Sequence, residues 1–95
     1  MSAYLIIDVD IPNPKRYEVY KRDVVKVIAR HGGEYLVRGG EFEVIEGDWQ
    51  PARLVLLRFP DRAAIHAFLI DPDYVPLRNL RNLIAKSRMI AVDGV

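Results

Sequence analysis

The chain contains no cysteine and no threonine, and it has one tryptophan and two histidines among its 95 residues. The lack of cysteine excludes disulfides, thiolate nucleophiles and zinc–thiolate sites. The two serines are Ser2, at the N-terminal end, and Ser87, before a predicted strand with no histidine close to it in sequence. Catalysis by a serine-type nucleophile is therefore not expected.

The chain also lacks a large excess of charge of one sign, and it has no long hydrophobic run. The chain has 14 basic and 13 acidic residues and a net charge of +1, so we expect no nucleic-acid partner. No run approaches the ~20 apolar residues of a membrane span, and the N-terminus lacks the basic region of a signal peptide. The sequence thus predicts a cytoplasmic protein without membrane contact. No phosphate-cradling loop and no metal-ligand spacing occurs, so we expect neither cofactor nor metal.

What is present suits one folded domain over residues 1–95. Hydrophobic residues make up 51% of the chain and charged residues 28%. A domain of this length buries roughly two-thirds of the surface that its unfolded chain exposes. The sequence therefore predicts a globular protein with a modest core.

Alternating apolar residues predict a first strand over residues 4–11. Asn13 is a suitable N-cap, and Pro14 is suited to the first helical position. The following helix, residues 15–31, has one apolar stripe that includes Tyr17 and Tyr20, and Gly32 is expected to end it in a left-handed conformation.

The next stretch contains two short runs of strand-forming residues, Glu34–Arg38 and Phe42–Ile45, separated by Gly39-Gly40. Paired glycines permit backbone conformations that other residues resist. We interpret Gly39-Gly40 as a bulge or kink within one long strand, because bulges redirect strands at the rims of barrels. A compact reversal into two paired strands is the alternative.

Further strands are predicted at residues 53–59 and 88–93. Between them, Asp61 is expected to cap a short helix, and a second helix is expected from about Pro76 to Ala85 because Pro76 cannot lie deep inside a helix. The order strand, helix, strand, strand, helices, strand predicts an α+β, ferredoxin-like βαββαβ sandwich. Its four-stranded antiparallel sheet would carry the helices on one face.

We predict that any small-molecule site lies between the sheet and the helices, near His31 and Arg38. The first helix ends at His31, and Arg38 follows along the second strand, where a bend could turn it inward. A guanidinium can hold a carboxylate, and an imidazole can transfer a proton. Tyr17 and Tyr20 would supply aromatic wall and hydroxyl groups. The alternatives are that His31 only ends the helix and that Arg38 forms an exposed or interface salt bridge.

Apolar residues occupy both faces of the predicted sheet, and the helices can cover only one. An exposed apolar face of this size is rare in a monomer, so the sequence predicts a homodimer. Trp49 is interpreted as a lid or as an interface anchor, with the interface favoured because tryptophan is enriched there.

Several segments together resemble a family of small bacterial proteins of unknown function in the dimeric α/β-barrel superfamily. They are GGEYLVRGG (residues 32–40), EVIEGDWQPAR (43–53), RFP (58–60), DPDYVPLRNLR (71–81) and AVDG (91–94). The resemblance covers nearly the whole chain. It implies a ferredoxin-like subunit that pairs with a second copy to form a barrel.

That superfamily includes cofactor-independent monooxygenases, isomerases, haem-binding enzymes and ligand-sensing domains. Because the resembled family has no established reaction, no catalytic residue is carried over from it. The sequence predicts a small-molecule-binding protein. One reading is a cofactor-independent enzyme acting on a small organic acid or enol, and the other is a non-catalytic binding or structural dimeric module.

Overall fold

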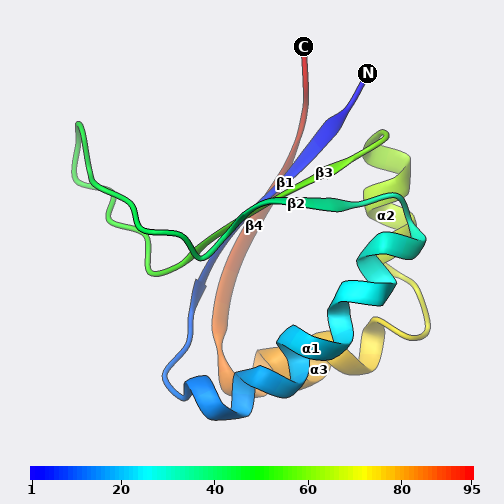
Figure 1. Ribbon diagram of the computed structural model, residues 1–95, viewed down its shortest axis with the longest axis horizontal. Helices are drawn as coiled ribbons and strands as arrows, with labels where there is room; N and C mark the ends of the chain where they lie inside the picture. Colours follow the sequence, from blue (N-terminus) through cyan, green and yellow to red (C-terminus); the bar gives the residue numbers. More distant parts are fainter.

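The computed structural model describes residues 1–95. Its elements follow one another as β1 (Ala3–Asp10), α1 (Pro14–Arg30), β2 (Glu34–Arg38), β3 (Leu54–Phe59), α2 (Arg62–Leu69), α3 (Val75–Ile84) and β4 (Lys86–Asp93). The strands form one antiparallel sheet in the order β2-β3-β1-β4. The three helices lie on one face of that sheet (Figure 1). The predicted ferredoxin-like fold is confirmed.

Capping residues at both ends of helix α1 match those expected from the sequence. The Asn13 side chain accepts a hydrogen bond from the backbone N–H of Arg16, and Pro14 is the first helical residue. At the other end Gly32 has a φ of +77°, and the N–H groups of Gly32 and Gly33 donate to the carbonyls of Ala29 and Ile28. This is a Schellman motif, in which glycine takes the left-handed position.

The second half of the chain also follows local signals. The Asp61 carboxylate accepts a hydrogen bond from the backbone N–H of Ala64 at 2.8 Å, which confirms it as the cap of α2. Helix α3 begins at Val75, one residue before the predicted start, because Pro76 is tolerated within the first turn. None of the three helices has both the length and the hydrophobicity needed to cross a membrane.

The core fills the space between the sheet and the helices. One face of β1 and β3 turns its alternate residues toward the helices, as the period of two requires. The most deeply buried large side chains are Leu5, Val9, Val27, Leu57, Phe59, Ile65, Phe68 and Tyr74. The opposite face of the sheet has no element of this chain packed on it (Figure 1).

The second strand differs from the prediction. It ends at Arg38 and does not continue through Gly39-Gly40 to Ile45, and its bulge lies between Tyr35 and Val37. Gly39 has a φ of +72°, which turns the chain away from the sheet. Because β3 begins only at Leu54, no strand is available to pair with residues 42–45.

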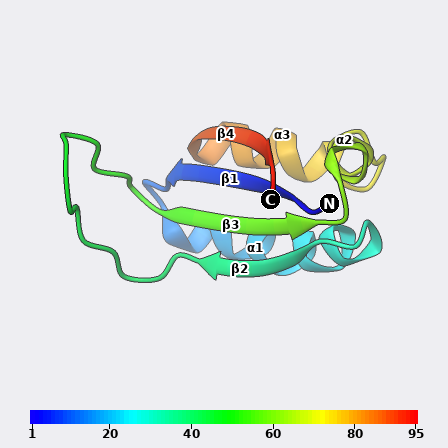
Figure 2. The same ribbon diagram turned by 90° about the horizontal axis from the view of Figure 1, so that it is seen from above.

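Residues 40–52, which we call the arm, link β2 to β3 without regular secondary structure. The arm extends beyond the end of the sheet (Figure 2). No residue from 40 to 52 takes part in a backbone–backbone hydrogen bond. The arm therefore contributes its side chains and its backbone groups mainly to the surface.

Candidate functional site

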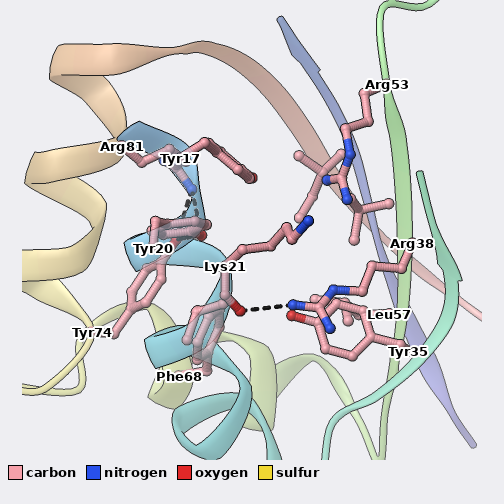
Figure 3. A pocket seen from close by; sticks show the side chains of 13 residues that line it. Tyr17, Tyr20, Lys21, Tyr35, Arg38, Arg53, Leu57, Phe68, Tyr74 and Arg81 are labelled. Atoms are coloured by element: carbon pink, nitrogen blue, oxygen red, sulfur yellow. Dashed lines mark hydrogen bonds between the residues drawn. The ribbon is translucent and has the colours of Figure 1, made fainter. Parts of the chain in front are cut away.

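A small cavity of about 30 Å³ lies between the sheet and the helices, which is room for about one water molecule. Helices α1 and α3 approach it from one side and strands β1, β2 and β3 from the other (Figure 3). Its lining contains four cationic residues and no acidic one. The lining residues are Ile7, Tyr17, Tyr20, Lys21, Val24, Tyr35, Arg38, Arg53, Val55, Leu57, Phe68, Tyr74 and Arg81.

The bulge in β2 places two of these side chains. Tyr35 pairs with Leu57, but after the bulge Arg38 pairs with Val55. Both partners belong to the helix-facing side of β3, so Tyr35 and Arg38 share that side although they are three residues apart. In an unbroken strand, Arg38 would lie on the opposite face from Tyr35. The extra residue thus brings Arg38 to the cavity.

Each of three arginines lies against a tyrosine ring. The guanidinium carbon of Arg38 is 4.5 Å from the centroid of the Tyr35 ring, and that of Arg53 is 5.7 Å from Tyr17. The guanidinium carbon of Arg81 is 5.8 Å from the Tyr20 ring. These distances fall within the range of cation–π attraction. The aromatic wall therefore holds positive charge around the cavity.

Arg81 is buried on α3, with 5% of the residue exposed. Its Nη1 atom donates to the hydroxyl of Tyr74 at 2.7 Å and lies 3.5 Å from that of Tyr20, and its Nη2 atom donates to Asn82 at 3.3 Å. The Nε atom is buried without a partner. A buried guanidinium without a carboxylate is costly, because its desolvation is not offset by an opposite charge.

Three tyrosine hydroxyls of the cavity stay protonated. Burial raises the pKa of Tyr17 and of Tyr35, and it raises the pKa of Tyr20 far above the physiological range. A protonated hydroxyl can donate a hydrogen bond to an anion. The cavity thus combines fixed cations with neutral donors.

Arg38 closes the cavity on the side of α1. Its Nη2 atom donates to the backbone carbonyl of Lys21 at 2.7 Å, as the dashed line in Figure 3 shows. The Arg38 side chain is otherwise exposed and forms no salt bridge with a carboxylate. A carboxylate that entered from this side would meet the free donors of Arg38 before those of Arg81.

Of the four predicted site residues, Tyr17, Tyr20 and Arg38 line this cavity, and the structure does not bring His31 to it. His31 is the C-cap of α1, and its Nε2 atom lies 2.7 Å from a carboxylate oxygen of Asp71. The hydrogen bond with His31 lowers the pKa of Asp71 to about 2, and the N–H of Asp73 and the guanidinium of Arg30 also lower it. His31 joins α1 to the loop before α3.

Four further lining residues were not among the predicted site residues: Tyr35, Arg53, Tyr74 and Arg81. Arg81 did carry a signal, because it lies in one stripe of α3 with Leu77 and Ile84 at helical spacing. A charged residue within an apolar stripe points inward. Arg53 carried a similar signal, because alternation along the predicted strand 53–59 places it on the same face as Val55 and Leu57.

On the opposite face of the sheet, Asp8 joins β1 to β4 and to the arm. Its carboxylate accepts hydrogen bonds from Arg88 at 3.1 Å, from the indole of Trp49 at 3.4 Å and from the N–H of Ala52 at 2.9 Å. The register places Asp8 opposite Leu54 on β3. Trp49 therefore lies on the face that the helices leave uncovered.

The fold and the cavity define a class of protein: a ferredoxin-like α+β subunit with a small cationic cavity under its sheet. The model of a domain of unknown function, DUF1330, matches residues 2–95. The chain belongs to this family, and the predicted resemblance to a family of unknown function is confirmed. No curated protein matches the chain in sequence.

Solved structures share the fold at low sequence identity. A protein of unknown function from Rhodopseudomonas palustris, RPA0582, has a TM-score of 0.77 and 22% identity over 99% of this chain and 82% of that one. A dimeric ferredoxin-like protein of unknown function from Jannaschia sp. CCS1 has a TM-score of 0.73 and 10% identity over 99% and 100%. SnoaB from Streptomyces nogalater, a cofactor-independent oxygenase, has a TM-score of 0.69 and 12% identity over 99% and 93%.

Proposed function

We propose that the protein binds a small organic acid, with the carboxylate held in the cavity between α1, α3 and the sheet. The observation that carries this proposal is the buried guanidinium of Arg81, which has a free Nε atom and no acidic neighbour among the lining residues. An anion would supply the missing charge and accept the unused donor. Lys21, Arg38 and Arg53 would add to the positive potential at the same place.

The size of the cavity limits the ligand. About 30 Å³ is enough for little more than a water molecule, so only the head group of an acid enters. Movement of the Arg38 side chain away from the Lys21 carbonyl would open the cavity on that side. The remainder of the ligand would then lie at the surface near α1 and β2. A small carboxylate with a short apolar body fits these conditions.

The test compares acids with matched neutral amides. Acetate and benzoate are titrated against acetamide and benzamide at low chloride, and the melting temperature and the heat of binding are measured. Binding of the acid alone is expected, because only the acid brings a charge to the guanidinium. A ligand at 100 times its Kd adds about 2.7 kcal/mol to the stability. If no acid binds better than its amide, the anion site is refuted.

Three variants locate the site. Arg38→Gln should weaken binding at least about tenfold, since a hydrogen bond to a charged group contributes ~1.5–3 kcal/mol. Arg58→Gln is the matched control, because Arg58 lies on β3 but pairs with Glu34 on the other face. His31→Ala should leave the affinity unchanged. If only Arg58→Gln reduces binding, the ligand occupies the opposite face of the sheet.

Catalysis on such an acid is a second candidate, favoured by the likeness of the fold to a cofactor-independent oxygenase. The cavity offers cations and hydroxyls but no carboxylate or imidazole base, so the ligand's own acidity would have to supply the reactive enolate. An acid that binds is incubated in deuterated water, and exchange of its α-hydrogens and oxygen consumption are followed. If the acid binds but neither hydrogen exchange nor oxygen consumption is detected, the protein is a non-catalytic binding protein.

We also propose that the protein is a homodimer that buries the uncovered face of its sheet. That face carries Ile6, Leu54, Leu56, Ile90 and Val92, of which Ile90 is 62% exposed and Val92 44% exposed. A dimeric protein with this fold supports the proposal. Sedimentation at micromolar concentration should give twice the chain mass, and Leu56→Lys should give the monomer. A monomeric mass for the unaltered protein would overturn it.

A further inference from the structure

The arm combines strand-forming residues with unpaired backbone groups. In an extended strand, residues 41–45 would place Phe42 and Val44 on one side and Glu41, Glu43 and Ile45 on the other. Phe42 is 43% exposed and Ile45 83% exposed. Irregular loops of this length are uncommon in small domains and usually carry a function. The segment has the composition of a strand but no strand beside it.

The sheet also has a free edge, strand β4, whose outer backbone groups lack a partner. Strand β4 is bonded to β1 on one side only, so eight residues have one edge unpaired. A long exposed edge can accept a further strand. The other edge, β2, has five residues and a bulge, and both features discourage strand addition.

Charge distinguishes β4 as the partner of the arm. The arm carries Glu41, Glu43, Glu46 and Asp48 and no basic residue. Taking these four charges from the net charge of +1 leaves +5 on the remainder of the chain. The first half of β4 contributes two exposed basic residues to the uncovered face: Lys86, which forms no salt bridge, and Arg88, which also donates to Asp8. The arm is thus complementary to the rest of another copy of this chain.

We propose that residues 41–45 add as a strand to the free edge of β4 in a second copy of the chain. A parallel alignment places Glu41 beside Lys86, Glu43 beside Arg88 and Ile45 beside Ile90. Cross-strand pairs of opposite charge and of apolar residues both stabilise such an edge. Each subunit would give one arm and receive one, as the two-fold symmetry of a dimer requires.

This proposal rests on the homodimer and adds to it. Packing of the two uncovered sheet faces needs no ordered arm, whereas strand addition gives residues 42–45 hydrogen bonds that they lack within one chain. The C-terminal end of the arm lies beside the uncovered face, where Trp49 bonds to Asp8. Burial of the apolar face and addition of the arm would therefore form one continuous interface.

Because the chain has no cysteine, single cysteines can map this contact. Tagged Ile45→Cys protein is mixed with untagged Ile90→Cys protein, the subunits are allowed to exchange, and the mixture is oxidised mildly. Both residues are exposed, so the changes should not unfold the chain. A covalent dimer of intermediate mass is expected. Pairing Ile45→Cys with Lys86→Cys tests the antiparallel alignment.

The matched control pairs Ile45→Cys with Lys26→Cys, an exposed position on α1. If neither β4 position gives more mixed dimer than Lys26→Cys, the strand addition is wrong. Hydrogen exchange on the unaltered protein is the second measurement. The amides of residues 42–45 should be protected at least about tenfold more above the dimer Kd than below it. If the amides of residues 42–45 exchange fast in a protein that sediments as a dimer, the arm contact is refuted and the homodimer stands. A monomeric mass overturns both the homodimer and the arm contact.

Discussion

Replacing Arg81 by methionine should stabilise the ligand-free protein and abolish binding of organic acids. Arg81 is 5% exposed, and its guanidinium has no carboxylate partner. Burial of an ion carries a penalty of several kcal/mol. Against this, one short hydrogen bond to the Tyr74 hydroxyl contributes ~1.5–3 kcal/mol, and the bonds at 3.5 and 3.3 Å contribute less.

The balance leaves about 1–3 kcal/mol of destabilisation that methionine would relieve, because it fills a similar volume without a charge. In a domain of this size, each kcal/mol shifts the melting temperature by roughly 4–8 °C. Thermal unfolding of Arg81→Met in a buffer free of carboxylates should therefore occur at a higher temperature than that of the unaltered protein. The hydroxyls of Tyr20 and Tyr74, 3.4 Å apart, can still bond to each other.

The matched control is Arg78→Met, one turn earlier on α3 and outside the cavity lining. It should change the melting temperature little and keep acid binding. The reasoning is refuted if Arg81→Met lowers the melting temperature in the absence of ligand, because the guanidinium would then be compensated within the protein. It is also refuted if Arg81→Met still binds acids as the unaltered protein does.

Three further predictions concern the fold. The pKa of Asp71 lies below its ordinary value of 3.8, at about 2. The contribution of this carboxylate to stability should therefore be complete above pH 4 and lost as the pH falls toward 2. In urea unfolding, the stability of Asp71→Asn should depend less on pH in this range than that of the unaltered protein. Asp61→Ala removes the cap of α2 and should lower the free energy of unfolding by ~1 kcal/mol, measured by urea unfolding. Gly39→Val should destabilise the fold by more than ~1 kcal/mol, because the φ of Gly39 is +72° and the added Cβ would lie 2.5 Å from Nε of Arg53. Gly40→Val is the control: a Cβ at Gly40 has open space, so this variant should be tolerated in the same assay.

Periodicity predicted those parts of the site that local structure determines. Tyr17 and Tyr20 lie on the inner stripe of α1 because a helix repeats every 3.6 residues, and the position of that stripe can be counted from the sequence. The same count places His31 at the end of the helix, as the structure does. Counting helical positions does not identify the residue that the His31 imidazole contacts, because Asp71 is 40 residues away along the chain.

The orientation of Arg38 shows where such counting stops. Alternation predicts that Arg38 and Tyr35 lie on opposite faces of a regular strand, and only one extra residue, Leu36, brings them to the same face. Neither glycine pair marks that position, since a bulge arises from the pairing of β2 with β3 rather than from the propensity of its residues. The positive charge of the cavity thus depends on register, a property of two strands together. For the same reason the prediction of a strand over residues 42–45 is wrong: their strand propensity is a local preference, and no strand of this chain is left to pair with them.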